Sequence, residues 1–507
     1  MNPSQFTYPN HRAMRSIAIA TIVAALALLG GCAVGPDFHT PSAPDVHGYS
    51  KDALPPKTVA ADAAGGEAQR FVQGMDIPGQ WWALFHSEPL NAVILRALDA
   101  NPDLQAAQAA LRVAQENLDA QSGSYYPAIN ANFTPTRQKV AQPIASPLAS
   151  GESLFNLHTA QLNISYTLDV FGGVRRQVES LEAQTEFQRF QLEATYLTLT
   201  SNVVAAAIQE ASLRAQVAAI REVIRIGSEV LGLMRGQYDL GAIAMADVVA
   251  QRAVLAQAQA ALPSLEKQLA QQRNLLTALT GRFPDAELGE KFELANLQLP
   301  LDLPVSLPSQ LVEQRPDVRA ATAQLHAATA QVGVAKANML PQITLNANIG
   351  SSADEISKLF TSGTGFWSLV GGLTQPVFAG GALLHKKRAA DAALDQVAAQ
   401  YRGTVITAFQ NVADSLRALQ YDADTLKAQA TAERAAAESL AISHQAMQLG
   451  AVSYLSLLNA EQTYQQATIN LAQARANRYA DTVALFQALG GGWWNRTEPS
   501  VNAAEGK

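Results

Sequence analysis

Two spacings of hydrophobic residues divide the chain into long helices and short strands. Hydrophobic residues recur every seven positions over long stretches, namely Val217, Ile224, Leu231 and Tyr238, and then Val248, Leu255, Leu262, Leu269 and Leu276. The same spacing returns at Leu457, Tyr464, Leu471, Arg478 and Leu485. A sustained repeat of seven predicts long α-helices that pack as left-handed coiled coils. We expect them at about 173–238, 243–281, 382–448 and 453–489, with a kink at Pro263.

Four shorter stretches alternate apolar and polar residues at every second position. Ile129, Ala131 and Phe133, for example, alternate with Asn130, Asn132 and Thr134. This period predicts strands with one apolar and one polar face, at about 127–137, 158–170, 341–350 and 366–378. In the last strand we assign Trp367, Leu369, Leu373 and Val377 to one face. Loops rich in Ser, Pro and Gly are expected at roughly 135–157 and 351–365.

Proline and glycine mark where these elements end. Shorter helices, about 102–125 and 316–340, should stop before Pro127 and Pro341, because proline cannot continue a helix. Glycine pairs let the backbone turn from strand into long helix, at Gly172, Gly173, Gly380 and Gly381. Further glycines predict chain reversals between the long helices, at Gly236, Gly241 and Gly450. The long helices therefore form two antiparallel hairpins.

The chain contains one module twice. Pro102-Asp103-Leu104 returns as Pro316-Asp317-Val318, and Leu240-Gly241-Ala242-Ile243 returns as Leu449-Gly450-Ala451-Val452. We place the first copy at 86–300 and the second at 301–492. Each copy reads helix, strand, strand, long helix, tip, long helix. A repeat of this length is too long for a solenoid unit and indicates a duplicated structural module.

The N-terminus carries a targeting signal. Arg12 and Arg15 precede an apolar stretch from Ile17 to Leu29, which ends in Gly30-Gly31-Cys32. This arrangement resembles a bacterial lipobox and implies a signal peptide at 1–31 and a lipid on Cys32. A plain signal peptide with a chance cysteine is the alternative. Ala33 is compatible with the outer membrane. Residues 32–85 are expected to form an extended segment over the helices, and 493–507 a tail that is disordered after Trp494.

Composition excludes several classes of protein. The 507 residues have a net charge of −7, which argues against a nucleic-acid partner, and a single cysteine, which excludes an internal disulfide. A mean hydropathy of +0.01 excludes a polytopic helical membrane protein. The sequence has no phosphate-binding loop, no His-Glu-x-x-His and no nucleophile elbow. We expect no enzyme activity, no metal site and no cofactor besides the covalent lipid.

The strands indicate a membrane β-barrel. One apolar and one polar face beside a lipoprotein signal is the pattern of an outer-membrane barrel. Four strands cannot close, and open strand edges cannot face lipid, so the chain must oligomerise. Three copies would give twelve strands and room for a lumen. Two alternatives stay open: a soluble β-sandwich and a lipid-anchored periplasmic scaffold that does not conduct.

Several motifs together carry a family resemblance. They are Gly31 to Asp37, Trp81-Trp82, the two Pro-Asp helix starts, the two glycine tips and Leu489 to Trp494. Over Cys32 to Trp494 the chain resembles the TolC/OprM-like outer-membrane efflux factors, NodT-type lipoprotein branch. The resemblance implies a mainly α homotrimer whose twelve-stranded barrel in the bacterial outer membrane continues into a coiled-coil periplasmic tunnel. It also implies docking to a periplasmic adaptor (membrane fusion protein) and an inner-membrane pump, for passive export of drugs or other small molecules.

The resemblance further implies that the tips of the helical hairpins close the tunnel. Asp247 matches the family's gate aspartate. Ser456 and Asn459 are neutral where relatives are often acidic, and Met447 and Val452 stand where some relatives carry the Tyr and Arg of the closing network. Tyr238 and Asp239 remain on the first hairpin. We expect a narrow constriction that is less acidic than in relatives. Alternatively, Asp247 only stabilises the start of its helix.

Overall fold

Two compact units make up the chain. The computed structural model describes residues 33–46, 48–141 and 153–496. The strand unit takes Met1–Thr40, Arg112–Glu186 and Thr322–Gln400, and the helical unit takes Pro41–Leu111, Phe187–Ala321 and Tyr401–Lys507. The predicted signal peptide at 1–31 and the lipid site at Cys32 lie outside the described residues.

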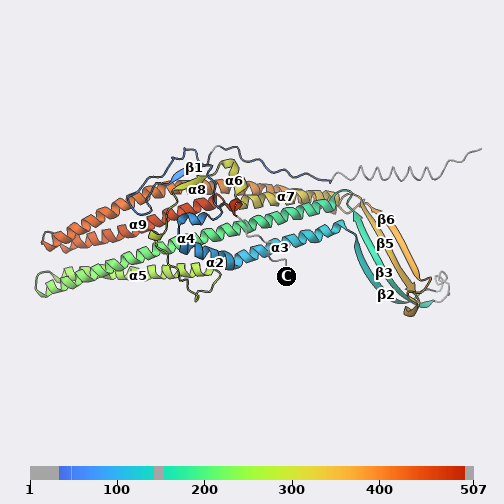
Figure 1. Cartoon of the computed structure of the whole chain (residues 1–507), viewed down its shortest axis with the longest axis horizontal. Helices are drawn as coiled ribbons and strands as arrows, with labels where there is room; N and C mark the ends of the chain where they lie inside the picture. Colours follow the sequence, from blue (N-terminus) through green and yellow to red (C-terminus); the bar gives the residue numbers. More distant parts are fainter. Residues whose placement is uncertain (1–32, 47, 142–152, 497–507) are drawn as a thin grey trace, which may run out of the picture. The chain divides into compact units, whose positions relative to one another are not determined.

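The strand unit holds a four-stranded antiparallel sheet (Figure 1). Its strands are β2 (Ala128–Lys139), β3 (Leu154–Leu168), β5 (Gln342–Ala353) and β6 (Gly365–Thr374), in the order β2-β3-β5-β6. Each copy of the module contributes one hairpin, and the pairing of β3 with β5 joins the two copies. β2 and β6 form the two edges, so the backbone groups on their outer sides have no strand partner within the sheet.

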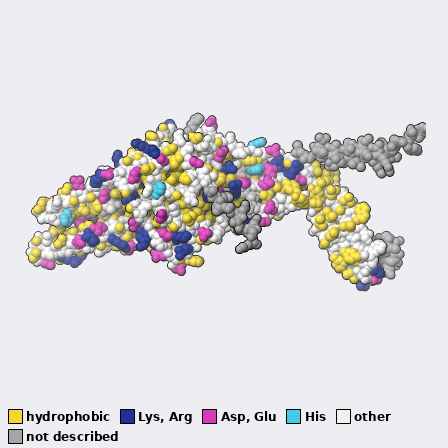
Figure 2. Space-filling model, in the orientation of Figure 1, with side chains coloured by type: hydrophobic (Ala, Val, Ile, Leu, Met, Phe, Trp, Pro, Cys, Tyr) yellow, Lys and Arg dark blue, Asp and Glu magenta, His cyan; other side chains and the backbone are white. Residues whose placement is uncertain are grey.

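The register of the sheet sorts side chains onto an apolar face and a polar face. One row across the four strands is Ala131, Leu162, Ile349 and Trp367, and the next row, on the opposite face, is Asn130, Asn163, Asn348 and Ser368. The apolar row is exposed, with Trp367 at 76% and Ile349 at 57%. Figure 2 shows hydrophobic side chains gathered over the strand end of the molecule. Among the described residues of the strand unit no second sheet covers either face.

The strand predictions were wrong at several ends. β3 begins at Leu154 instead of 158, and β5 continues to Ala353 instead of stopping at 350. β6 stops at Thr374 instead of reaching 378, because Pro376 has no N–H to donate to a ladder. Val377 therefore lies outside the strand, 93% exposed. The expected loop at 135–157 is shorter than predicted, since β2 continues to Lys139 and pairs through Pro135 with His158. Proline is tolerated there because β2 is an edge strand.

Long helices account for most of the remaining chain. They are α3 (Pro102–Ser122), α4 (Gly173–Asp239), α5 (Met245–Leu279), α7 (Pro316–Ala337), α8 (Ala382–Gln448) and α9 (Tyr454–Ala488). α4 and α8 have 67 residues each, about 100 Å at 1.5 Å per residue. α5 continues through Pro263. Gly236 lies inside α4 and does not reverse the chain, contrary to expectation. α3 and α7 each end three residues before the predicted boundary.

The helical unit also contains short elements that the sequence reading missed. These are β1 (Arg70–Gln73), η1 (Trp81–Phe85), α2 (Glu88–Ala100), β4 (Asp302–Val305) and α6 (Pro308–Gln314). β1 pairs in parallel with β4. The signal for α2 is present in the sequence: Ser87 caps it by accepting the Leu90 N–H at 3.4 Å. The buried residues of α2 have helical spacing, at Leu90, Val93, Ile94 and Ala97.

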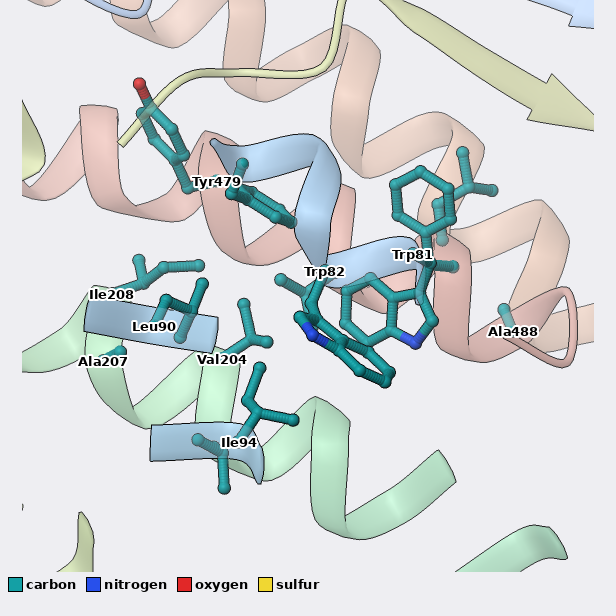
Figure 3. Packing of buried hydrophobic residues seen from close by; sticks show 14 of the residues in the cluster. Trp81, Trp82, Leu90, Ile94, Val204, Ala207, Ile208, Tyr479 and Ala488 are labelled. Atoms are coloured by element: carbon teal, nitrogen blue, oxygen red, sulfur yellow. The ribbon is translucent and has the colours of Figure 1, made fainter. Parts of the chain in front are cut away.

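The two tryptophans of η1 enter the core of the helical unit (Figure 3). Trp81 is 1% exposed, and its ring stacks on Phe486 of α9 with centroids 5.4 Å apart. Trp82 packs beside Ile94 of α2 and Val204 of α4. The extended segment at 32–85 is thus fixed by large buried side chains.

Arg478 occupies a hydrophobic position of the α9 heptad and is fully buried. Its guanidinium donates to Gln69 Oε1 at 3.4 Å, to Thr58 Oγ1 at 3.1 Å and to the Glu67 carbonyl. Burial lowers the pKa of Arg478. A buried cation is tolerated only where oxygen atoms replace its hydrating water. The N-terminal segment supplies these oxygens, which the hydrophobic positions of the α9 heptad cannot provide.

In the strand unit, the residues after Cys32 are held by a second set of contacts. The Val34 N–H donates to the Phe171 carbonyl at 3.1 Å, and Arg176 forms an ion pair with Asp37 at 2.6 Å. Phe38 stacks on His326 with centroids 4.3 Å apart. The chain leaving Cys32 therefore has a defined path along this unit.

The C-terminus is ordered beyond the predicted point. The short helix η6 covers Trp493–Asn495, and the Asn495 amide donates to Asp76 at 2.7 Å. Arg496 pairs with Glu193 at 2.6 Å. The predicted tail of 493–507 therefore begins no earlier than residue 497, and 497–507 lie outside the described residues.

Candidate functional site

The two turns that join the long helices have the same backbone conformation. Gly241 and Gly450 have φ of +75° and +69°, a region that residues with a Cβ rarely adopt. The Gly241 N–H donates to the Tyr238 carbonyl at 2.8 Å, and the Gly450 N–H to the Met447 carbonyl at 3.0 Å. Both turns satisfy the last carbonyls of the preceding helix in this way. The duplication therefore preserves the tip geometry.

The helices that follow the turns start differently. α9 is capped by Ser453, whose hydroxyl accepts the Ser456 N–H at 3.4 Å. α5 starts after Ala244, which has no capping side chain, and carries Asp247 in its first turn. A carboxylate at a helix N-terminus is stabilised by the helix dipole. Asp247 thus fits its role as a helix-start carboxylate, and its half-buried position leaves part of it facing solvent.

A hydrophobic cluster holds the tips of the two hairpins together. We call it the tip cluster; its buried residues are Val230, Leu231, Met234, Val248, Leu255 and Leu457. Met447 and Tyr454 are among the partly buried residues that pack against it. All four helices α4, α5, α8 and α9 contribute, so a movement of one hairpin against the other exposes part of this cluster.

A hydrogen bond that sequence reasoning missed spans the two hairpins. The Tyr454 hydroxyl at the start of α9 donates to Gln237 near the end of α4. Burial raises the pKa of Tyr454, as does the negative charge of Asp247, while the bond to Gln237 lowers it. Asp247 therefore lies within electrostatic reach of this contact. The only sequence signal was an aromatic residue directly after the tip turn.

The other predicted gate residues are exposed in the single chain. Tyr238 and Val452 are 40% and 36% exposed, and Asp239, Ser456 and Asn459 lie at the surface. The structure thus brings Met447 and Asp247 toward the contact between the hairpins. It leaves the remaining five predicted residues on the surface of the tips.

A buried carboxyl, also missed by sequence reasoning, lies farther along α9. Glu461 is 8% exposed, and burial raises its pKa. The side chain of Gln251 on α5 forms a hydrogen bond to it, which acts in the opposite direction, as does His444 of α8. Gln251 also donates to the Gly227 carbonyl of α4 at 3.4 Å. These hydrogen bonds therefore link α9, α5 and α4, and Glu461 has no ion pair among the described residues.

A pair of carboxyl groups connects α8 to α9. Burial raises the pKa of Asp481 to about 7, and the neighbouring carboxyl of Asp422 contributes to the same shift. Two carboxyl groups this close favour a shared proton over two negative charges.

The glycines and prolines predicted to mark the strand–helix junctions lie at those junctions. Gly172, Gly380 and Gly381 have φ of +75°, +58° and +83°, while Gly173 is the first residue of α4. At Gly172 a Cβ would lie 2.5 Å from the Cβ of Ala33, so glycine also makes room for the N-terminal segment. Pro127 and Pro341 directly precede β2 and β5. The described residues contain no cluster of side chains able to hold a metal ion.

Comparison with known proteins gives one consistent family. The family model described as outer membrane efflux protein matches residues 93–282 and 307–491, one segment in each copy of the module. The chain is 30% identical over 495 residues to the toluene efflux pump outer membrane protein TtgC of Pseudomonas putida. The match covers 96% of this chain and 97% of that protein.

Two further relatives agree with this match. The probable outer membrane lipoprotein SilC of Salmonella typhimurium is 28% identical, over 95% of this chain and 99% of its own length. Among solved structures, the outer-membrane channel OprN superposes with a TM-score of 0.81 at 26% identity, covering 91% of this chain and 100% of that one.

The buried carboxyl of Glu461 predicts a pH-dependent stability. Its folded pKa lies above the ordinary value of 4.5, so the native state holds more protons than the unfolded state as pH rises from about 4.5 through the raised pKa. Stability is therefore fully present below 4.5 and falls across that window. Glu461→Gln removes the ionisation, and we expect it to raise the melting temperature over wild type at pH 8 but not at pH 4. Thermal unfolding of the detergent-solubilised protein measures both.

Glu438→Gln, at an exposed position of α8, is the matched control and should leave the melting temperature unchanged at either pH. An equal shift at pH 4 and pH 8 for Glu461→Gln would show that Glu461 is not a source of pH-dependent stability.

Proposed function

This chain belongs to the outer membrane efflux protein family, and we propose from that premise how it assembles, where it docks and what it exports. It is the outer-membrane channel component of an efflux system and not an enzyme. The proposal concerns its trimeric state, its lipid anchor, its partners, its gate and its cargo.

We propose a homotrimer with a twelve-stranded barrel. The carrying observation is the sheet: both edges are free, and the apolar face is exposed in the single chain. Neighbouring strands alternate in direction from β2 to β6, so β6 of one copy can pair antiparallel with β2 of the next. Three copies then close the ladder, turn the apolar face to lipid and enclose the polar face. Open edges in lipid are not an alternative, because each unpaired backbone group costs several kcal/mol there.

The anchor is a lipid on Cys32. The lipobox of the sequence and the lipoprotein SilC support this assignment. The contacts of Val34, Asp37 and Phe38 on the strand unit hold the residues after Cys32 against Phe171, which follows β3, and against helices α4 and α7. The lipid adds membrane affinity, and the barrel spans the membrane without it.

The tip turns are the docking surface for a periplasmic adaptor, which links the channel to an inner-membrane pump. Leu240 and Leu449, equivalent in the two copies, are 86% and 84% exposed. A trimer presents six such turns, and six exposed leucines repeated around the axis offer an adaptor an apolar contact at every turn. The pump supplies the energy, because this chain is the channel component of the efflux system.

The exposed neutral residues Ser456 and Asn459 and the carboxylate of Asp247 form the gate around the tunnel end. The cargo is small organic molecules, of the kind named for the toluene pump component TtgC.

The native mass tests the barrel. We expect a trimer from outer membranes in detergent, and we expect Cys32→Ala to stay membrane-embedded, because the strands hold it there. A monomer, or a Cys32→Ala protein released by a salt wash, contradicts the barrel and favours the lipid-anchored scaffold.

Docking is tested at the tip leucines. Leu240→Ser with Leu449→Ser should abolish crosslinking to the adaptor and export of a fluorescent dye, while the trimer stays intact. Each substitution removes the burial of one leucine side chain against the adaptor, which is worth about 1.5–3 kcal/mol. The loss occurs three times in the trimer. Leu233→Ser, at a 67% exposed position within α4, is the control and should export normally. Normal export by the double variant would rule out docking at the turns.

Two variants test whether Asp247 acts at the gate in addition to stabilising the start of α5. Asp247→Asn and Asp247→Ala should both lower cation selectivity in single-channel recordings, because three carboxylates around the axis are lost. Either change should also cost about 0.3–1 kcal/mol of helix stability per chain. If both variants keep wild-type conductance and selectivity while the melting temperature falls, Asp247 serves the helix alone.

A further inference from the structure

Amides and hydroxyls make up most of the polar face of the sheet, which also holds Phe155, Leu157, Phe366 and Val370. The register places Asn130, Asn163, Asn348 and Ser368 in one row. The neighbouring rows on this face hold Asn132 with Gln161, and Ser165 with Asn346. Asparagine recurs on this face, although asparagine is a poor strand former. Strand propensity therefore does not explain why asparagine occupies several positions on this face.

Charged side chains are absent from this face in the described strands. Reading every second residue from Ala128 to Gln138, Phe155 to Thr167, Gln342 to Ser352 and Phe366 to Thr374 gives no Asp, Glu, Lys or Arg. The strand charges that exist, Arg137 and Lys139, belong by register to the apolar face, near the β2–β3 loop.

Charges just beyond the strands are of both signs, and several of them form ion pairs. Asp169, one residue past β3, accepts the Val174 and Arg175 N–H groups at 2.9 Å and pairs with the Arg175 guanidinium at 3.3 Å. At the other end of the sheet, Lys358 pairs with Glu355 at 2.8 Å and with Asp354 at 3.6 Å. Both ends of the sheet therefore carry charges of both signs.

The amides partly satisfy one another. Ser368 Oγ donates to Asn348 Oδ1 at 3.0 Å, and Gln161 Nε2 donates to Asn163 Oδ1 at 3.0 Å. Each amide still has donor and acceptor capacity to offer to a solute. The face can hydrogen-bond to anions and cations alike and attracts neither over long range.

We propose that the barrel lumen is a charge-neutral, amide-lined passage that admits organic anions and cations equally. This inference rests on the proposed barrel, in which threefold repetition would turn any one charged residue into a ring of three. Without such a ring the barrel imposes no charge filter, and any charge selection is left to the tips. The admissible cargo therefore includes organic anions, which an acidic barrel would repel.

Charged thiol reagents measure this property directly. Asn348→Cys puts a thiol on the polar face, and Ile349→Cys puts one on the apolar face next to it. Cys32 is the only native cysteine, so the unsubstituted protein gives the background rate. Trimers in outer-membrane vesicles react with a cationic trimethylammonium-ethyl or an anionic sulfonato-ethyl methanethiosulfonate. Each rate is divided by the rate of the same reagent with free 2-mercaptoethanol.

We expect Asn348→Cys to react with both reagents at a normalised cation-to-anion ratio within about twofold of one, and Ile349→Cys to react with neither. Adding Asn163→Asp, opposite Asn348 in the register, calibrates the assay. That carboxylate should raise the ratio about tenfold, the Coulomb expectation for a unit charge at about 6 Å in water acting with opposite sign on the two reagents. Ser368→Cys in the same row serves as a second probe.

The outcomes distinguish a failure of the neutral passage from a failure of the barrel. A ratio of about tenfold or more at Asn348→Cys and Ser368→Cys without the added aspartate overturns the neutral passage and leaves the barrel standing. Reaction of Ile349→Cys as fast as Asn348→Cys, no reaction at either polar-face cysteine, or no response to Asn163→Asp overturns the enclosed lumen itself and with it the proposed barrel.

Discussion

The four-stranded sheet leaves two edges and one apolar face uncovered, and these groups constrain the rest of the molecule. An edge strand in water can be tolerated, but an edge in hydrocarbon cannot, because no solvent there replaces the lost hydrogen bonds. The exposed row that includes Ile349 and Trp367 equally requires an apolar partner. Lipid can cover the apolar face, and an edge strand of a second copy of the chain can pair with the free edge. The need to assemble thus follows from the backbone of one sheet.

Polar groups buried in the helical unit show how the parts of the chain depend on each other. Arg478 is stable in the α9 seam because Thr58, Glu67 and Gln69 of the N-terminal segment accept its hydrogen bonds. Glu461 has no comparable cation among the described residues, and burial raises its pKa. Polar groups of this kind tie distant segments together, since separating the segments would expose or orphan them.

The duplication preserved backbone geometry more strictly than side-chain chemistry. The tip turns share their left-handed glycine and their exposed leucine. The helix starts after them differ, with a serine cap on α9 and a carboxylate in the first turn of α5. In a trimer the six tips would then alternate in charge around the axis. The duplicated module therefore gives a trimer six similar turns for docking. The carboxylate at the helix start occurs at only three of them.

The sequence alone determined the kinds of element, because hydrophobic period and proline and glycine positions act locally. The spacing of seven predicted the long helices, and the spacing of two predicted a sheet with an apolar and a polar face. α2 could also have been found, since Ser87 and its buried residues carry a local signal. β6 could have been ended before Pro376 by the same rule.

Only the tertiary structure decided which groups meet. It placed Gln69 against Arg478, Tyr454 against Gln237 and Gln251 against Glu461, pairs that are far apart in sequence or identified by no periodicity. It also fixed the register that gathers asparagines into one row of the sheet. Such contacts depend on how whole elements pack and align, and the pattern within one element holds no information about its neighbour.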